Sequence, residues 1–246
     1  IKEHFGNQAL QKWDDKKAVA RDPKTLEKYR TMLVDQIQYF KVTQYFFFKQ
    51  WSELKHYANQ KGIKIIGDMP IYVAADSVEV WTKPELFQLD EERNPLVVAG
   101  VPADQFSATG QLWGNPLYAW EEHKKQGYAW WIHRIEESFK IYDVLRIDHF
   151  KGFSDYWQVD GKADIAKYGS WQPGPGYDLF KAVKEQLGDL PIIAEDLGNI
   201  DDKARKLLAD CHYPGMKILQ FGFEDVSGKS LDSPHYCIPH SIVYTG

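Results

Sequence analysis

The stretch "VLRIDHFKG" (144–152) begins like a buried β-strand and ends in charged side chains. Its apolar residues suit a strand that other elements cover. Arg146, Asp148 and His149 lie within it or directly after it. Three ionisable groups in so short a run are costly to bury unless they are paired or used. This stretch therefore predicts both a buried sheet and a polar site where one strand ends.

The same unit, a short apolar strand with a polar end followed by a helix, recurs along the chain. Strands are expected at 63–69, 143–149, 190–197, 216–223 and 241–245. Their nearly continuous apolar residues predict burial on both faces, as in parallel sheets flanked by helices. Helical spacing predicts helices at 24–38, 128–141, 177–187 and 201–210. The alternation favours a parallel α/β architecture.

Two segments are less regular. Residues 39–62 are ambiguous: "FKVTQYFFF" is expected as a strand and "KQWSELKHYANQKG" as a helix that ends at Gly62. From Ile71 to Gln126 no helix is clear, and turn residues are frequent, as in "GVPADQFSATGQLWGNPLY" (100–118). A long irregular segment in a compact domain is usually a functional loop or an inserted subdomain. A packed surface insertion with buried aromatic rings is the simpler interpretation.

Composition and charge argue against several classes of function for this protein. The chain has 246 residues, is 43% hydrophobic and 26% charged, and carries a net charge of −5 with acids and bases mixed. This balance lacks the clustered positive charge with which proteins bind DNA or RNA. No apolar run approaches the roughly 18–20 residues that span a bilayer, so no membrane partner is expected. Two cysteines make neither a disulfide framework nor a metal site, which favours a reduced, cytoplasmic setting.

Aromatic residues are unusually frequent, with nine Trp, fourteen Tyr and thirteen Phe. Such rings can pack a core, stack on bases or lie against the C–H faces of sugar rings. The acidic balance makes bases the least favoured of these partners.

Acids follow three of the expected strands: Asp68, Asp148, and the pair Glu195–Asp196. In parallel α/β proteins, chemistry occurs at the carboxyl ends of the strands. Arg146 and Asp148 are two residues apart, so they share one face of a strand. A neighbouring guanidinium favours the charged form of a carboxylate, whereas Glu195, after the apolar run "PIIA", is set to hold a proton.

One charged and one protonated acid are the arrangement of retaining glycoside chemistry, with the two carboxyls roughly 5–5.5 Å apart. The pattern therefore favours a sugar-processing site. Simpler interpretations stay open. Arg146–Asp148 can be a structural ion pair, and Glu195–Asp196 can be acids at a helix N-terminus. His149 can be a packing residue, and Asp68 can simply end its strand.

These residues lie in motifs that closely resemble the amylomaltase, or 4-alpha-glucanotransferase, family, glycoside hydrolase family 77 of the α-amylase clan. The matching stretches are "GDMPIYVAADSVEVW" (67–81), "GVPADQFSATGQLWGNPLY" (100–118), "VLRIDHFKGF" (144–153) and "PIIAEDLG" (191–198). The last three, in this order and spacing, are highly specific as a set. The similarity extends over essentially the whole chain.

The resemblance implies an incomplete (β/α)8 TIM barrel. Residues 1–71 and 127–246 would form parts of the barrel, and 72–126, after the strand ending at Asp68, would form a loop-rich insertion over the active site. Asp148 would be the nucleophile and Glu195 the acid/base. Arg146 would hold the nucleophile, and His149 and Asp68 would line the donor sugar subsite. The loop at 100–118 supplies further substrate-contact candidates: Asp104, Phe106, Ser107, Gln111 and Trp113.

The reaction implied by the resemblance transfers part of an α-1,4-glucan to the 4-hydroxyl of another sugar. Its partners are maltooligosaccharides and α-1,4-glucans, and neither a metal nor an organic cofactor takes part. Acceptor length and oligomeric state are left open.

The chain also departs from the family. Family members are about twice as long, and their third carboxylate lies in a "THDN" sequence beyond the strand at 241–245. We therefore expect a fragment with little activity of its own. Two alternatives are kept: an α-amylase-type hydrolase or debranching enzyme of the same clan, and a glucan-binding fragment without turnover. A nucleic-acid module is disfavoured by the net charge.

Overall fold

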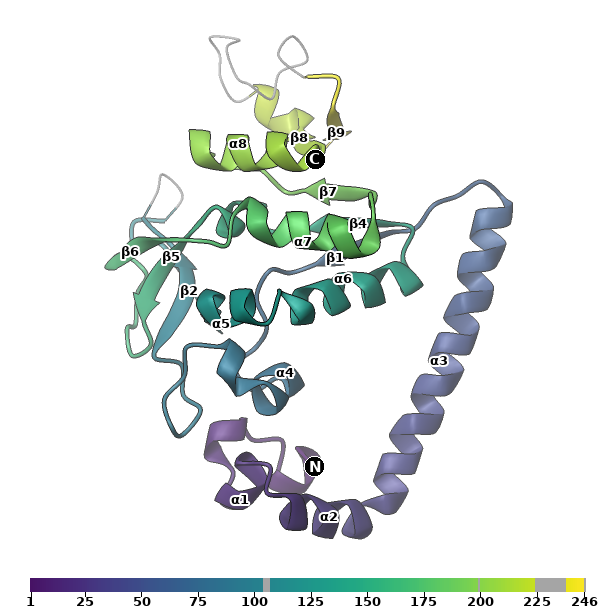
Figure 1. Ribbon diagram of the computed structural model, residues 1–246, viewed down its shortest axis with the longest axis vertical. Coiled ribbons are helices and arrows are strands. Elements are labelled where there is room, and N and C mark those ends of the chain that lie inside the picture. Colours follow the sequence, from purple (N-terminus) through teal and green to yellow (C-terminus); the bar gives the residue numbers. More distant parts are fainter. Residues whose placement is uncertain (104–106, 199, 224–237, 246) are drawn as a thin grey trace. The chain divides into compact units, whose positions relative to one another are not determined.

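The computed structural model describes residues 1–103, 107–198, 200–223 and 238–245. The chain forms two compact units, whose elements are labelled in Figure 1. The first unit consists of Ile1–Ile63, Tyr72–His123 and Trp157–Trp171. The second consists of Lys64–Ile71, Lys124–Tyr156 and Gln172–Gly246.

A parallel sheet forms the centre of the second unit. Its strands are β1 (Ile66–Met69), β4 (Val144–Ile147) and β7 (Ile192–Ala194), in the order β1-β4-β7. Strand β8 (Gly215–Ile218) pairs in parallel with β9 (Ser241–Tyr244). The Ala194 N–H donates to the Pro214 carbonyl at 3.0 Å, which joins β7 to the start of β8. Because these strands are parallel, their carboxyl ends lie at one edge.

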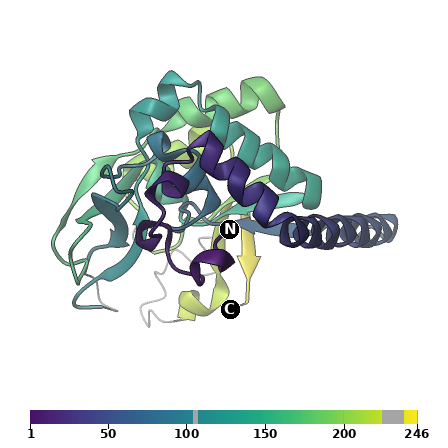
Figure 2. The same cartoon turned by 90° about the horizontal axis from the view of Figure 1, so that it is seen from below.

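Three helices connect these strands: α6 (Ala129–Ile141), α7 (Tyr177–Leu187) and α8 (Asp202–Cys211). Figures 1 and 2 both show α6 and α7 side by side. Each helix buries one apolar stripe, and the fully buried side chains include Trp131, Ile135, Leu179 and Phe180. Two 3-10 helices, η4 (Phe150–Phe153) and η5 (Leu219–Phe223), follow β4 and β8.

The first unit carries most of an antiparallel sheet. Strand β2 (Val97–Val101) pairs with both β3 (Gln111–Pro116) and β5 (Asp155–Asp160), and β6 (Gly169–Pro173) is next to β5. Its helices are α1 (Lys16–Val19), α2 (Pro23–Met32), α3 (Val34–Gln60), α4 (Val78–Thr82), α5 (Trp120–Lys125), η1 (Glu3–Phe5), η2 (Leu10–Lys12) and η3 (Pro84–Leu86).

Several sequence expectations need correction here. The strand expected at the start of 39–62 is wrong, because α3 runs unbroken through it and a helix satisfies its own backbone hydrogen bonds. The helix expected at 24–38 is divided at Leu33. The strand expected at 216–223 ends at Ile218 and continues as η5. The segment from Ile71 to Gln126 contains the short helices α4 and α5 as well as β2 and β3.

Burial on both faces of the parallel strands is confirmed only in part. All three residues of β7 are buried. Burial alternates along β1 and β4, and Ile66 is 51% exposed. The prediction was wrong for these two strands because helices cover one face, while the other carries Asp68 and Arg146 at its polar end.

Within the described ranges, no helix is long and apolar enough to cross a membrane. Helix α3 has 27 residues, but charged side chains such as Lys41 and Lys49 interrupt its aromatic run.

Candidate active site

Three neighbouring strands of the second unit bring charged side chains to the same edge of the sheet. In the register of β1 with β4, Asp68 pairs with Arg146. Asp148 directly follows Ile147 at the end of β4, and Glu195 directly follows Ala194 at the end of β7. The parallel arrangement therefore assembles the acids that the sequence places at separate strand ends.

Arg146 joins two of these acids. Its Nη1 donates to Asp68 Oδ1 at 2.6 Å and its Nη2 to Asp148 Oδ1 at 2.8 Å. Burial alone would lower the pKa of this guanidinium, but the two carboxylates more than offset it and raise the pKa further. Arg146 and Asp148 do share one face, as their spacing predicts. Asp68 is an additional partner, so Arg146 fixes two acids rather than one.

Glu195 meets different surroundings. Burial raises the pKa of its carboxyl, and the nearby charge of Asp148 adds to this effect. Two backbone N–H groups act in the opposite direction: His149 donates to Oε2 and Leu197 to Oε1, each at 2.8 Å. The pKa remains above that of an ordinary glutamic acid. Glu195 is thus held in a fixed orientation and retains a proton more readily than an exposed acid.

His149 adopts a left-handed backbone conformation, with φ 51° and ψ 49°. This conformation is uncommon for residues other than glycine, and at functional sites it persists where surrounding contacts impose it. Burial lowers the pKa of the imidazole to about 4, so the ring is neutral at neutral pH.

Asp196, unlike Glu195, binds the backbone of the next strand, β8. Its Oδ1 accepts the Met216 N–H at 2.6 Å, at the start of β8. The interpretation of Glu195 and Asp196 as helix N-terminal acids is wrong, because α8 begins only at Asp202 and is capped by Asp201. The apolar strand β7 instead delivers Glu195 to the sheet edge and turns Asp196 toward β8.

Sequence reasoning missed a buried ion-pair cluster next to these acids. Lys151 donates to Asp155 and, at 2.8 Å, to Asp201 Oδ2. The spacing of Lys151 and Asp155, four residues apart, was the available signal. Nothing in the sequence indicated that Asp201 joins them.

Of the other substrate-contact candidates, Ser107, Gln111 and Trp113 belong to the first unit. Asp104 and Phe106 lie outside the described residues. Ser107 donates its hydroxyl to the Gly110 carbonyl at 2.8 Å, and the Trp113 indole donates to Gln111 Oε1 at 3.2 Å. Trp113 is 37% exposed. The substrate contacts of all five residues stay predictions.

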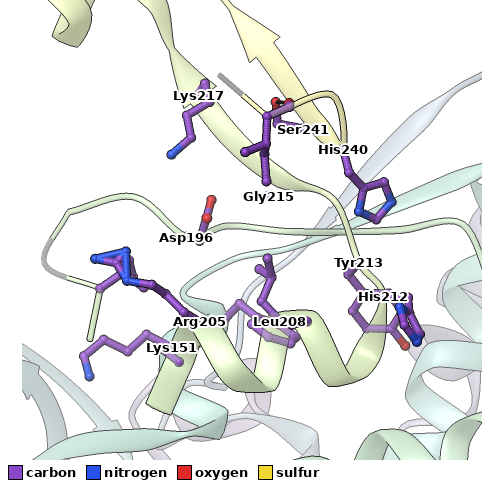
Figure 3. A pocket seen from close by; sticks show the side chains of 15 residues that line it. Lys151, Asp196, Arg205, Leu208, His212, Tyr213, Gly215, Lys217, His240 and Ser241 are labelled. Carbon is purple, nitrogen blue, oxygen red and sulfur yellow. Dashed lines mark hydrogen bonds between the residues drawn. The ribbon is translucent and has the colours of Figure 1, made fainter. Parts of the chain in front are cut away.

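A cavity of about 580 Å³ lies beside α8 in the second unit (Figure 3). Apolar side chains of α8, including Leu208, form much of its wall, and Asp196 and Lys217 also line it. Neither Asp148 nor Glu195 is among its lining residues. The cavity therefore borders the site on the Asp196 side.

In the part of the chain that the structure describes, one group of side chains has the spacing of a metal site: His133, Glu136 and Glu137 on α6. All three are exposed, and Glu137 is paired with Lys140. This pairing is ordinary for a solvated helix face.

The fold and these contacts define an α/β protein with a carboxylate–arginine site at the carboxyl edge of a parallel sheet. A family model described as 4-alpha-glucanotransferase matches residues 1–246. The chain belongs to this family, glycoside hydrolase family 77. The resemblance seen in its motifs is thereby confirmed.

Individual proteins that resemble this chain carry names of the same family. A 4-alpha-glucanotransferase of Streptococcus pneumoniae is 54% identical over 246 residues, which are 100% of this chain and 48% of that protein. One from Clostridium butyricum is 48% identical over 228 residues, covering 92% of this chain and 46% of that protein. A solved amylomaltase of Streptococcus agalactiae in complex with acarbose matches with a TM-score of 0.98 and 61% identity. The match covers 100% of this chain and 50% of that one, so the chain spans about half the length of its relatives.

Proposed function

We propose that this chain carries two acids of a retaining 4-alpha-glucanotransferase, which transfers α-1,4-glucan segments between maltooligosaccharides. The observation that supports this most is the contrast between the acids. Asp148 is paired with Arg146, whereas burial raises the pKa of Glu195. A carboxylate beside a protonated acid is the combination that glycosyl transfer through a covalent intermediate needs.

In the first step, a carboxylate oxygen of Asp148 attacks the anomeric carbon of the donor. The glycosidic C–O bond breaks, and Glu195 gives its proton to the departing 4-oxygen. In the second step, Glu195 takes the proton of the incoming 4-hydroxyl, whose oxygen displaces Asp148. The two inversions retain the α configuration, and Glu195 ends protonated again.

Arg146 would hold Asp148 and Asp68 in fixed positions, since its planar guanidinium donates to both carboxylates. Asp68 and the neutral ring of His149 would line the donor sugar subsite. The second-unit strand order, β1-β4-β7 followed by β8-β9, supports our proposal that these elements are part of an incomplete (β/α)8 barrel. The acarbose complex of the Streptococcus agalactiae amylomaltase supports a carbohydrate as the ligand. We place the activity in the cytoplasm, in keeping with a chain of only two cysteines.

The test uses a hybrid in which this chain replaces the matching half of the Streptococcus agalactiae amylomaltase. At 61% identity and a TM-score of 0.98, this exchange is conservative. The hybrid, the isolated chain and the unchanged amylomaltase are each incubated with maltotriose, and products are separated by length. We expect glucose and a ladder of longer maltooligosaccharides from the hybrid, and their loss in Asp148→Asn. The isolated chain is expected to show little turnover.

Other outcomes would favour other functions. Glucose and maltose without longer products would indicate a hydrolase of the same clan. No product from a folded hybrid, while the unchanged amylomaltase is active, would contradict the proposal and leave glucan binding without turnover.

A further inference from the structure

Lys151, Asp155 and Asp201 form an ion-pair cluster in the second unit that the proposed reaction does not use. Lys151 and Asp155 are each only 8% exposed. No other lysine or arginine is buried among the described residues. Lysine is almost never buried unless it is paired, and removing one partner of a buried pair leaves an uncompensated charge. The position of this ammonium is therefore closely specified.

The cluster connects the segments that follow the two proposed catalytic acids. Lys151 lies in η4, three residues after Asp148. Asp201 lies six residues after Glu195, and its Oδ1 caps α8 by accepting the Ala204 N–H at 2.9 Å. Its other oxygen, Oδ2, accepts from Lys151 at 2.8 Å. In Figure 3, the Lys151 ammonium points away from Leu208 and the apolar wall of the cavity.

The turn between Asp148 and Lys151 holds Glu195 directly. The His149 N–H donates to Glu195 Oε2 at 2.8 Å, and the next N–H, of Phe150, donates to the Glu195 carbonyl at 3.1 Å. Both bonds accompany the left-handed conformation of His149, which is unfavourable for a non-glycine residue. Strand β4 holds this turn on one side, and the ion pairs of Lys151 hold it on the other.

We infer that Lys151 is a positioning residue: by binding Asp155 and Asp201, it keeps the His149 N–H on the carboxylate of Glu195. The inference about the contact stands on the geometry of this chain alone. Its consequence for catalysis rests on the proposed function.

Loss of the His149 contact should change the pKa of Glu195 in one direction, which a titration can measure. The His149 N–H lowers the pKa of Glu195, so its withdrawal raises that pKa further. The other groups that act on Glu195 are Asp148 and Arg146 on the β4 side and the Leu197 N–H after β7. Arg146 is held by two carboxylates of the sheet edge, and the Leu197 N–H binds Glu195 itself. Replacing Lys151 also removes a positive charge, which by itself raises the pKa of an acid. Replacing Asp201 by asparagine removes a negative charge, which by itself lowers it, so a rise of the Glu195 pKa in that variant reports the turn.

The experiment titrates Glu195 in the 246-residue chain by NMR of 13C-labelled glutamate carboxyls, with Glu195→Gln assigning the signal. The variants are Lys151→Met, Lys151→Arg and Asp201→Asn. The asparagine side chain in the last variant retains an oxygen for the α8 cap but lacks the charge that binds Lys151. Asp210→Asn is the matched control, because it removes an exposed ion pair with Lys206 on the same helix.

We expect the Glu195 pKa to rise in Lys151→Met and Asp201→Asn, to return toward its original value in Lys151→Arg, and to stay unchanged in Asp210→Asn. A Glu195 pKa that does not rise in Asp201→Asn, whatever Lys151→Met shows, would overturn the inference. If Lys151→Met does not fold, Asp201→Asn decides, since the Asp201 side chain is 43% exposed and its replacement is tolerated more easily.

Kinetics of the hybrid test the catalytic consequence separately. Lys151→Met should lower kcat for maltotriose about tenfold or more, with KM changed by less than about twofold, because misplacement of a catalytic group acts on the chemical step. A hybrid without any turnover would contradict the proposed function and leave the NMR result to judge the positioning role. An active hybrid whose kcat is unaffected by Lys151→Met would contradict the catalytic consequence.

Discussion

Asp148 and Glu195 follow neighbouring strands, yet their surroundings favour opposite tasks. Asp148 is 44% exposed at its side chain and bound by a guanidinium. Glu195 is largely enclosed, and two backbone N–H groups bind its carboxyl oxygens. The difference arises because β4 ends in Arg146-Ile147-Asp148, whereas β7 is apolar up to Glu195.

The raised pKa of Glu195 predicts the pH dependence of transfer. In the proposed reaction Glu195 is protonated for the first step, so kcat/KM of the hybrid should fall on the alkaline side, at a pH above the pKa of an ordinary glutamic acid. Glu195→Gln should lose about 10²–10⁴-fold with maltotriose but far less with a glucosyl fluoride, whose leaving group needs no proton. An equal loss with both donors would argue against the acid role.

The same shift affects stability. At Glu195, the folded chain holds more of the proton than the unfolded chain does at pH values between the ordinary pKa of glutamic acid and the raised pKa. This group's contribution to the free energy of unfolding therefore declines as pH rises through that window.

Gly215 predicts a second effect at the residue scale. A Cβ atom there would lie 2.5 Å from Asp196 Oδ2, so Gly215→Ala should displace the carboxylate that accepts the Met216 N–H. We expect a loss of roughly 1–3 kcal/mol in the free energy of unfolding, measured with urea. Gly215 does not have a positive φ, so the loss would come from the contact with Asp196 and not from backbone strain. A change of less than about 0.5 kcal/mol would show that the Asp196 carboxylate moves aside without cost.

Sequence alone predicted much at this scale and missed one class of contact. The acids at strand ends can be located in the sequence because they follow apolar runs. The shared face of Arg146 and Asp148 can be predicted because side chains two residues apart on a strand lie on the same face. The sequence does not predict the left-handed conformation of His149 or the ion pair of Lys151 with Asp201. Both depend on how the segment after β4 packs against the segment after β7. The sequence spacing between Lys151 and Asp201 carries no periodicity.

At the scale of elements, helix α3 has an unusual exposure. It has 27 residues and none is buried, although it contains a run of four aromatic residues, Tyr45 to Phe48. Residues 39–62, most of which lie in this helix, have an ambiguous sequence pattern because aromatic and β-branched residues also favour strands. The strand expectation failed here, whereas α6, α7 and α8 followed their expected ranges closely. Those three helices have clear apolar stripes, and α7 ends at Gly188.

This exposure predicts a contrast between two phenylalanines. Phe47 is 55% exposed on α3, and Phe180 is 2% exposed on α7. In the isolated chain, Phe47→Ala should change the free energy of unfolding by less than about 0.5 kcal/mol. Phe180→Ala should lower it by about 3–5 kcal/mol, because it leaves a cavity in the core. Urea unfolding at two protein concentrations measures both. A large, concentration-dependent effect of Phe47→Ala would instead show that α3 is covered by another copy.

At the scale of the whole molecule, the strand–helix alternation correctly predicted an α/β fold. It could not predict that the chain divides into two compact units, because long-range pairing such as β2 with β5 has no local signature. Asp68, Arg146, Asp148, His149 and Glu195 all belong to the second unit. Ser107, Gln111 and Trp113 belong to the first. The acids of the site can therefore be analysed from one unit alone.

Retaining transfer as proposed here requires Asp148 to form a covalent bond to the donor sugar. The most direct measurement is to incubate the hybrid with a 5-fluoro-α-glucosyl fluoride, digest it and locate the label by mass spectrometry. The added fluorine slows both steps, and the fluoride leaves without acid assistance. We expect a glycosylated peptide that contains Asp148 and is absent from Asp148→Asn. A label on Asp68 or Glu195 instead, or none from a hybrid that still makes longer oligosaccharides, would contradict it.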